Sequence, residues 1–535
     1  MNQQANTKQC IRYINRIIIY CFILIMSTYI LNHHPADAYE EERAVSVPIH
    51  TFDIRGNTVI KTETLQRILK DYIARHFPNS ELNFEDMKLL TDQITLTYKE
   101  KGYFLARCYL PKQDIHDGTL KMVVAEGTVD KIQVNGNIYY SERLLKGFFE
   151  QQLSTDIINE NDLEKGLILV NDLPFNHTEL LLTKGEKQGA VDIVLNNSDR
   201  FASQFIVDYN NYGAEHISKN RFSLAGKITD PYGGMTFNAK GITGNTPQDC
   251  LIGFANLDIP INYQGTHVSF SFIKSNAQLG QELSVIEMEG QTEMYGASIT
   301  HPLILRRNLR LNTLLGINHT VSETTAWKSI SVGTYKLNSV KASLSIDSVD
   351  HYFGKNQAQC LYQVSFVDKG PGIEKTNKAL QKIMLSASRM QQFTRHMHLS
   401  FRLSGQWSSD DLIPVDQIAI GGYDTVRGHP PSAYLGDMGY NFSFEWMISP
   451  KSDRQYFGQP LSKSLQWGLF VDQGWIRLNK DPLYDVQTKS LGGVGMGLRL
   501  FYKETFSCFM DLAVPINPLE NEDDVMMYFS AQAYF

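Results

Sequence analysis

The sequence lacks an excess of positive charge. Asp and Glu outnumber Lys and Arg among its 535 residues, and the formal net charge is -7. A nucleic-acid-binding protein needs clustered cations to neutralise phosphate groups. The composition therefore predicts no nucleic acid among the partners.

Cysteine is scarce and widely spaced. Cys10 and Cys21 lie close to the N-terminus, and the other four are Cys108, Cys250, Cys360 and Cys508, with no C-x-x-C pair among them. This spacing supports neither a disulfide framework nor a metal site. Nothing else in the sequence indicates a cofactor.

Catalytic motifs are also missing. The sequence contains no G-x-S-x-G and no H-E-x-x-H, and its fourteen histidines are scattered. An enzyme of the barrel phospholipase type would need Ser, His and an amide or acid brought together. We read isolated histidines such as His267 and His319 as wall residues, and we expect the protein not to be an enzyme.

Only one long apolar run is present. Lys8, Arg12 and Arg16 precede the apolar residues 17–31, and an A-x-A cleavage pattern follows at residues 36–38. This predicts a cleaved signal peptide over residues 1–38, with residues 39–48 as a short linker. A single membrane anchor is the alternative, but the run is shorter than the ~20 residues that span a bilayer. No later stretch predicts a transmembrane helix.

Residues 50–197 show helical periodicity and one internal repeat. Residues 52–57 (FDIRGN) reappear as residues 132–137 (IQVNGN), each an alternating strand that ends in a Gly-Asn turn. Similar elements follow each copy. We therefore predict two β-α-α-β-β modules in tandem, over residues 49–126 and 127–197.

The elements of the first module can be placed by their caps and apolar stripes. Thr62 is a candidate helix cap, and a second helix runs from about Asn83 to Gly102. Strands are expected over residues 104–110 and 119–125, joined by a turn at Asp117-Gly118.

The second module is read in the same way. Ser141 is expected to open a helix that buries Leu144, Leu145 and Phe148, and Asn161 is expected to open another. A hairpin of residues 178–183 and 190–195 closes the module.

Residues 198–535 are dominated by two-residue alternation. Phe222, Leu224 and Ile228 alternate with Ser223 and Lys227, and the same pattern recurs in residues 235–241, 267–272, 399–407 and 494–500. A strand that faces lipid outside and water inside needs this pattern. A soluble sandwich or barrel would also alternate, so the period alone leaves both open.

The C-terminus favours a membrane barrel. Val525, Met527, Phe529 and Phe535 fall on one face of a final strand that ends in an aromatic residue. In a closed barrel the last strand pairs with the first, because open edges cannot be left in hydrocarbon. The length suits about 16 transmembrane antiparallel strands, with about 14 or 18 as alternatives.

Three stretches resemble one family. Residues 98–114 (YKEKGYFLARCYLPKQD), with Gly118-Thr119-Leu120 and Glu126-Gly127, look like its first POTRA domain. Residues 421–429 (GGYDTVRGH) resemble its V-R-G-Y/F loop motif, and residues 470–474 (FVDQG) match its F-x-D-x-G strand motif. The family is that of the outer-membrane translocators of two-partner secretion, also called hemolysin secretion and activation proteins or TpsB proteins.

The resemblance implies a loop folded back into the barrel. Val426, Arg427 and Gly428 would form its tip, and Arg427 would reach Asp472, which lies between Phe470 and Gly474 on the wall. A guanidinium can bind a carboxylate there through two parallel hydrogen bonds. The alternative is a surface loop with an incidental arginine. The sequence departs from the family at His429, followed by Pro430-Pro431, and leaves little chain for an N-terminal plug helix.

The family's function gives further expectations. The modules would lie in the periplasm, capture an unfolded secreted partner protein of the TpsA type by strand addition, and deliver it to the barrel. Tyr103 and Arg107 are candidate client-binding residues, or else a core aromatic and a solvated charge. Phe535 is a candidate insertion signal read by the barrel assembly machinery, and outer-membrane lipid is a further partner. An assembly insertase and a passive porin are the alternatives.

Overall fold

The computed structural model describes residues 46–77, 81–115, 117–153, 155–187, 189–278, 288–327, 330–369, 379–452, 454–456, 458–479, 488–520 and 523–535. The predicted signal peptide and most of the predicted linker, where a plug helix was considered, lie outside these residues. The chain divides into two compact units. The first consists of the residues up to Thr97 together with Arg107–Ala125, and the second consists of Tyr98–Ala106 together with Glu126–Phe535. No helix among the described residues is long and apolar enough to cross a membrane.

The first unit is a small α/β sandwich. Its three-stranded sheet has the order β2-β5-β4, with β2 parallel and β4 antiparallel to β5. The elements are β1 (Val47–Pro48), β2 (Thr51–Arg55), α2 (Thr62–His76), β3 (Glu81–Leu82), α3 (Phe84–Glu100), β4 (Arg107–Tyr109) and β5 (Thr119–Ala125). Apolar side chains at helical spacing, including Leu65, Leu69, Leu90 and Ile94, are fully buried and form its core.

Two predictions about this region were wrong in detail. Thr62 does not cap α2, because Lys61 occupies the N-cap and the Thr62 hydroxyl accepts a hydrogen bond from Asn57 instead (2.9 Å). The predicted strand over residues 104–110 shrinks to β4. Gly102 (φ +89°) reverses the chain after α3, and the Ala106 N–H then donates to the Tyr103 carbonyl, so residues 103–106 form a turn.

The second unit begins with the same order of elements. These are β6 (Thr128–Asn135), α4 (Glu142–Gln152), α5 (Glu160–Asn171), β7 (Asn176–Lys184) and β8 (Ala190–Asp199), with the sheet order β6-β8-β7. Ser141 caps α4 as predicted, accepting from the Leu144 N–H. Asn161 was the wrong cap for α5, because Asn159 stands two residues earlier with extended backbone and accepts from the Asn161 N–H.

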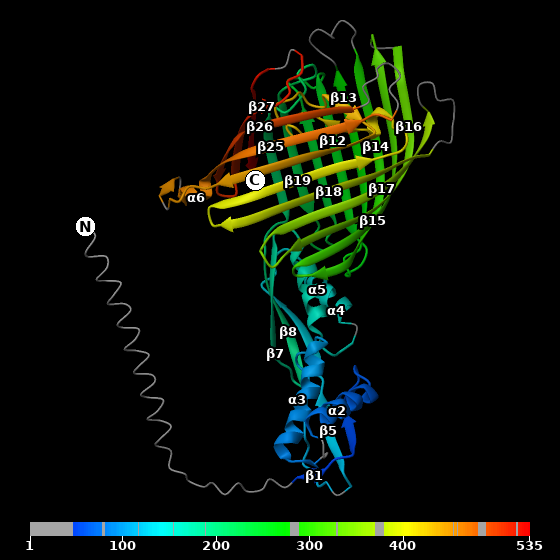
Figure 1. The fold of residues 1–535 in the computed structure, drawn as a ribbon, viewed down its shortest axis with the longest axis vertical. Coiled ribbons are helices and arrows are strands. Elements are labelled where there is room, and N and C mark those ends of the chain that lie inside the picture. The colour runs from blue at the N-terminus through cyan, green and yellow to red at the C-terminus, as the bar shows by residue number, and fades with distance from the viewer. Residues whose placement is uncertain are drawn as a thin grey trace, which may run out of the picture. The chain divides into compact units, whose positions relative to one another are not determined.

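A closed barrel follows, and its sixteen strands confirm the predicted fold class (Figure 1). All neighbours are antiparallel, and β28 closes the barrel against β9. The barrel strands are β9 (Ser203–Asn210), β10 (Arg221–Thr229), β11 (Thr236–Thr243), β12 (Cys250–Pro260), β13 (His267–Gln278), β14 (Glu289–Arg306), β15 (Leu309–Ala326), β16 (Ile330–Val349), β17 (Lys355–Lys369), β18 (Ala379–Thr394), β19 (Met397–Trp407), β22 (Met438–Ile448), β25 (Leu465–Arg477), β26 (Thr488–Tyr502), β27 (Phe506–Pro515) and β28 (Met526–Tyr534).

Smaller elements lie between the barrel strands. They are η2 (Pro414–Asp416), β20 (Ile418–Ile420), β21 (Tyr434–Gly436), β23 (Gln455–Tyr456), β24 (Gln459–Pro460) and α6 (Leu461–Ser464). The first three belong to one long connection between β19 and β22.

The barrel presents its apolar face outward. Leu224 on β10 is 59% exposed and Met496 on β26 is 57% exposed, whereas Ser223 on the opposite face of β10 and Asp511 on β27 are buried. A soluble barrel would turn the apolar face inward. The alternation therefore describes a wall with lipid outside and a polar lumen inside.

The helices of the second unit pack on turns at the end of the barrel where β9 begins. Tyr263, between β12 and β13, covers Gly147 of α4 and meets the Phe148 ring edge-on at 5.4 Å. Arg310 at the start of β15 pairs with Asp172 after α5 (2.5 Å). A glycine is needed at 147, because a Cβ there would lie 2.5 Å from the Tyr263 ring. Apolar and ionic contacts together fix this α/β region on the barrel.

Candidate functional site

A long loop, residues 408–437, connects β19 to β22 and folds into the lumen. β9 begins directly after β8 of the second module, so strand alternation places this loop at the opposite end of the barrel, as the sixth loop there. Its short strands β20 and β21 pair with each other, and its tip carries Val426 and Arg427, both buried. The wall residues that meet the tip lie on inward-facing positions of β22, β25 and β27.

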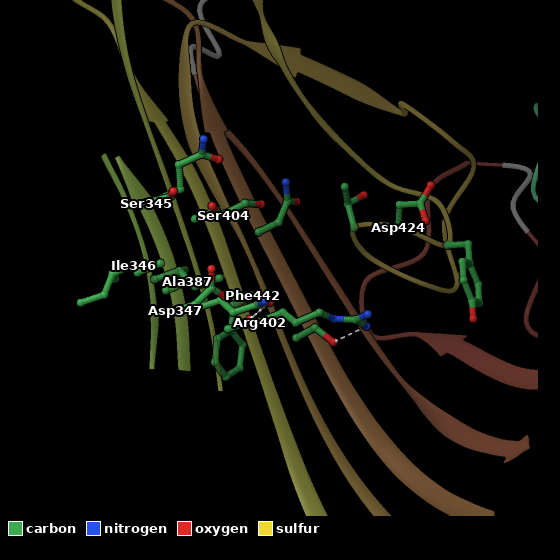
Figure 2. A pocket seen from close by; sticks show the side chains of 18 residues that line it. Ser345, Ile346, Asp347, Ala387, Arg402, Ser404, Asp424 and Phe442 are labelled. Atoms are coloured by element: carbon green, nitrogen blue, oxygen red, sulfur yellow. Dashed lines mark hydrogen bonds between the residues drawn. The ribbon is translucent and has the colours of Figure 1, made fainter. Parts of the chain in front are cut away.

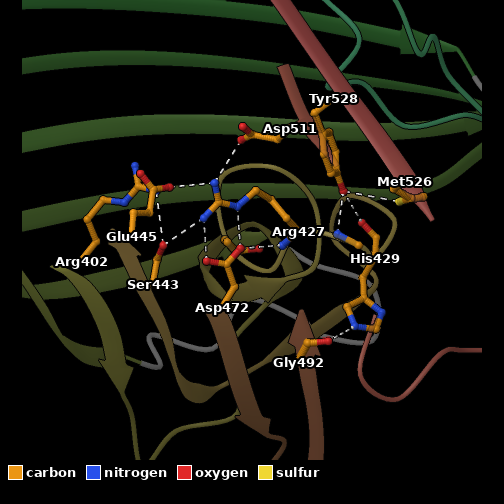
Figure 3. Close-up of polar contacts among 12 residues, drawn as sticks. Arg402, Arg427, His429, Ser443, Glu445, Asp472, Gly492, Asp511, Met526 and Tyr528 are labelled. Carbon is orange, nitrogen blue, oxygen red and sulfur yellow. Dashed lines mark hydrogen bonds and ion pairs between the residues drawn. The ribbon is translucent and has the colours of Figure 1, made fainter. Parts of the chain in front are cut away.

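Arg427 is bound to Asp472 through three hydrogen bonds (Figure 3). Its Nε donates to Oδ2 at 2.7 Å, an Nη donates to Oδ1 at 2.9 Å, and its backbone N–H donates to Oδ2 at 3.1 Å. The side chains are 2% and 1% exposed. This is the two-pronged geometry that arginine allows and lysine does not.

Two further carboxylates bind the same guanidinium. Glu445 on β22 lies 2.7 Å from it and Asp511 on β27 lies 3.1 Å from it. Arg402 pairs with Glu445 at 3.1 Å, and Arg499 pairs with Asp511. Three arginines thus meet three carboxylates, so that the cluster is neutral overall and each charge has a partner, while the Arg402 side chain remains 57% exposed.

The other residues of the two motifs shape the contact. The Arg427 guanidinium lies over the Phe470 ring at 3.5 Å, which adds a cation–π interaction. A Cβ at Gly474 would come within 2.8 Å of the Val426 side chain, so glycine permits the close approach. Gly428 (φ +95°) donates its N–H to the Tyr528 hydroxyl at 3.1 Å.

His429 occupies the position where the family pattern has an aromatic residue. Its ring is fully buried, and Nε2 lies 2.9 Å from the Gly492 carbonyl of β26. The departure from the pattern therefore leaves the loop tip attached to the wall. Tyr423, six residues earlier, stacks on Tyr212 beyond β9 at 3.7 Å.

The two sequence motifs predict the contact between Arg427 and Asp472, but they do not predict the other charged residues of the cluster. Glu445, Asp511, Arg402 and Arg499 belong to no motif. One signal was available, because each is a charge within an alternating strand, as in Phe509-Met510-Asp511-Leu512. A charge in such a strand must face the lumen and find a partner there.

The lumen is open beside the loop tip. A cavity of about 470 Å³ lies between the wall and residues 423–425 (Figure 2). Small polar side chains line much of it, among them Ser345, Ser386, Ser388 and Ser404. A second cavity of about 520 Å³, at the end of the barrel where α5 packs, shares Asp347, Gln357, Ser388 and Arg402 with the first. The two cavities adjoin through these shared polar residues, and we call the space along them the polar path.

The other candidate residues lie outside this site. Tyr103 is half-buried in the turn after α3 and meets the Tyr98 ring edge-on at 6.1 Å. Arg107 is exposed at the start of β4, and burial raises the pKa of the neighbouring Cys108 thiol to about 12. Phe535 is exposed, and its N–H donates to the Phe205 carbonyl at 2.9 Å. Across the described ranges, no group of three His, Cys, Asp or Glu side chains could hold a metal ion.

Comparisons with known proteins agree on one kind of protein. A family model described as haemolysin secretion/activation protein ShlB/FhaC/HecB matches residues 189–500, and a POTRA domain of the ShlB type matches residues 47–127. The heme/hemopexin transporter protein HuxB of Haemophilus influenzae (strain 86-028NP) is 24% identical over 89% of this chain and 85% of its own length.

Two further comparisons extend this result. The outer membrane transporter CdiB of Escherichia coli O6:K15:H31 (strain 536 / UPEC) is 20% identical over 83% of this chain and 75% of its own. The solved structure of CdiB from Escherichia coli superposes with a TM-score of 0.78 at 19% identity, covering 94% of this chain and 93% of that one.

Proposed function

This chain belongs to the haemolysin secretion/activation protein ShlB/FhaC/HecB family of outer-membrane translocators, and we propose that it captures one unfolded exoprotein in the periplasm and exports it through its barrel. The protein resides in the outer membrane, with its POTRA region in the periplasm. The partner is a large secreted protein of the hemolysin or adhesin kind. Transport rather than catalysis is the activity of the family.

The observation that carries this proposal is a barrel whose polar lumen contains a long loop, residues 408–437, held to the wall by Arg427 and Asp472. A passive porin needs no such loop and no periplasmic modules. Here the loop tip is held by a cluster whose positive and negative charges balance, so releasing the tip exchanges protein–protein bonds for bonds to water. A loop of this kind closes the path at rest and yields when a chain enters.

Capture of the client falls to the two α/β modules. Residues 127–197 repeat the element order of the matched POTRA domain, and we assign them as a second POTRA domain. In this second module, Thr178 on the edge strand β7 exchanges hydrogen bonds with the Asn171 amide. The ladder alternates, so Leu180 and Leu182 present backbone groups on the same edge, to which an extended client can add a strand. Tyr103 and Arg107 remain candidate contacts of the first module.

Two more partners belong to this proposal. Lipid of the outer membrane surrounds the apolar wall. The barrel assembly machinery inserts the chain during biogenesis, with Phe535 at the end of the final strand as the residue it reads. Lipid is a partner because the outer wall is apolar and water does not solvate it. The assembly machinery is a partner because the last strand must pair with the first for the barrel to close.

The test follows the exported protein. If a gene beside this one encodes a very large secreted protein, deleting the present gene should trap that protein in the periplasm, as seen by fractionation and surface labelling. The intact gene on a plasmid should restore surface display. Normal surface display of that protein in the deletion strain would refute the proposal.

A further inference from the structure

A second contact, remote from the Arg427 cluster, holds the base of the loop. Asp416 at the end of η2 pairs with Lys382 of β18, with Nζ 2.9 Å from Oδ1. The two side chains are 12% and 8% exposed. A buried pair of this kind is stable only when its remaining hydrogen-bonding positions are filled.

Those positions are filled by residues of two further strands. On β17, Gln363 donates to Asp416 Oδ1 and Ser365 donates to Oδ2, both at 3.0 Å. The Asp416 carbonyl accepts from Lys382 at 2.8 Å and from Gln406 of β19 at 3.0 Å. Three adjacent strands therefore bind one loop residue through both its side chain and its backbone.

An apolar cluster next to Asp416 strengthens the contact. Leu412 and Ile413 of the loop pack against Leu337 of β16, Val367 of β17 and Leu380 of β18. The Leu412 N–H donates to Asp437 at 2.8 Å, which ties the two ends of the loop together. We call residues 412–417 with these partners the base anchor.

Apart from β19, which carries both Gln406 and Arg402, the base anchor and the Arg427 cluster use different strands. The base is held by β16–β19, and the Arg427 cluster draws its carboxylates from β22, β25 and β27. Between them stand Gly421 (φ +104°) and Gly422 (φ +96°), where a Cβ would come within 2.4 and 2.8 Å of Pro430 and Pro431. Glycine lacks a Cβ and can adopt several backbone conformations, so these two positions can change conformation once their contacts with Pro430 and Pro431 are released.

We propose that Asp416 is a positioning residue. Held by Lys382, Gln363 and Ser365, it fixes the base of the loop on the wall while the tip, residues 423–431, detaches and returns by turning at Gly421-Gly422. The loop then opens the polar path without leaving the lumen, and a fixed base brings Arg427 back to Asp472. This rests on the proposed function in taking the loop as the gate.

The test exchanges the ionic anchor for a covalent one. Ser365→Cys with Asp416→Cys is made in the full chain after Cys108, Cys250, Cys360 and Cys508 are changed to alanine. The Ser365 hydroxyl and an Asp416 carboxylate oxygen are in hydrogen-bond contact at 3.0 Å, and loss of both free thiols on oxidation verifies that the disulfide has formed. Purified protein is recorded in planar lipid bilayers in KCl, oxidised and then reduced.

With the disulfide formed, the channel should fluctuate as the parent does, and adding Arg427→Ala should still produce long openings. After reduction, the open fraction should rise about tenfold, which corresponds to about 1.4 kcal/mol. Two results would overturn the proposal: an oxidised channel that stays shut even with Arg427→Ala, or a reduced channel that behaves like the parent.

A charge exchange provides a second measurement if the disulfide does not form. Asp416→Lys and Lys382→Asp should each raise the open fraction, and the two together should bring it back to within about twofold of the parent. An exchange no better than the single variants would count against the base anchor. Heat-modified migration on gels checks that each barrel has folded. The recordings contain no exported protein, so they stand apart from any failure of export.

Discussion

Arg427 is the residue on which the tip of the loop depends. Its side chain is buried, and Asp472, Glu445 and Asp511 all direct carboxylate oxygens at it. The sequence motif predicted one of these partners. The other two were not predictable from the motif, because which inward-facing charges meet is set by how far each strand is staggered around the barrel.

Replacing Arg427 with alanine should open the channel. The three carboxylates would keep only Arg402 and Arg499 as counter-ions, and losing a partner from a dry buried pair costs on the order of 3–5 kcal/mol. Water in the adjacent cavity reduces this cost. We expect long-lived openings in bilayer recordings. Arg477→Ala, at an exposed position on β25, is the matched control and should gate normally.

The open fraction of the Arg427→Lys channel should lie between those of the parent and of Arg427→Ala. Lysine keeps the charge but cannot make the two parallel bonds to Asp472. Open fractions measured in the same recordings should rank parent, Arg427→Lys, Arg427→Ala. A lysine variant that gates like the parent would show that charge alone holds the tip.

At the scale of elements, the seam between β28 and β9 decides whether the barrel closes. It pairs five residues on each strand, and backbone bonds between Phe535 and Phe205 extend it by one step. The sequence predicted this pairing, because a terminal alternating strand has no other partner in a closed sheet. The Phe535 ring takes no part in the backbone bonds and is 75% exposed.

This separation allows a test of the insertion signal. Phe535→Ser keeps the backbone pairing and removes the ring, whereas deletion of Phe535 removes both. If the ring is read during assembly, both variants should lower the amount of folded barrel in outer-membrane fractions several-fold. Normal levels for Phe535→Ser, with loss only on deletion, would leave closure of the seam as the whole role of this residue.

A second prediction concerns α4 and the barrel turn it packs on. Gly147→Val would force a side chain into the Tyr263 ring, and overpacking of this kind costs about 1–3 kcal/mol. Protease should then cleave within residues 126–199 faster than in the parent. Gln151→Val, on an exposed position of the same helix, is the control. Equal cleavage of all three proteins would mean that the contact does not hold the module in place.

At the scale of the whole molecule, the outward apolar face determines where the protein can exist. The exposed band includes large side chains such as Leu224, Ile317, Leu344 and Met496. Surface of this extent is stable only against lipid or detergent. The protein should therefore leave membranes only in detergent and resist extraction by high salt or alkaline carbonate. Recovery as a water-soluble monomer would contradict the orientation of the wall.

Some features of this protein follow from its sequence alone. The period of apolar residues changes from helical to alternating near residue 197, and this change predicts small α/β modules followed by a barrel because period dictates which face of an element is buried. The motifs at residues 426–428 and 470–474 predict a partner for Arg427. The local predictions were wrong at the caps of α2 and α5 and in the length of β4. At these positions a single hydrogen bond determines which of several neighbouring residues begins the element.

Other features were decided only by tertiary structure. An alternating strand has two faces, and only closure of the sheet established that the apolar one points outward. Glu445 and Asp511 join Arg427, and Lys382 joins Asp416, across 84 residues or fewer of intervening chain. Such pairs depend on the register of sixteen strands and the path of one loop. That geometry is a property of the closed barrel, so it cannot be predicted from any local segment of the sequence.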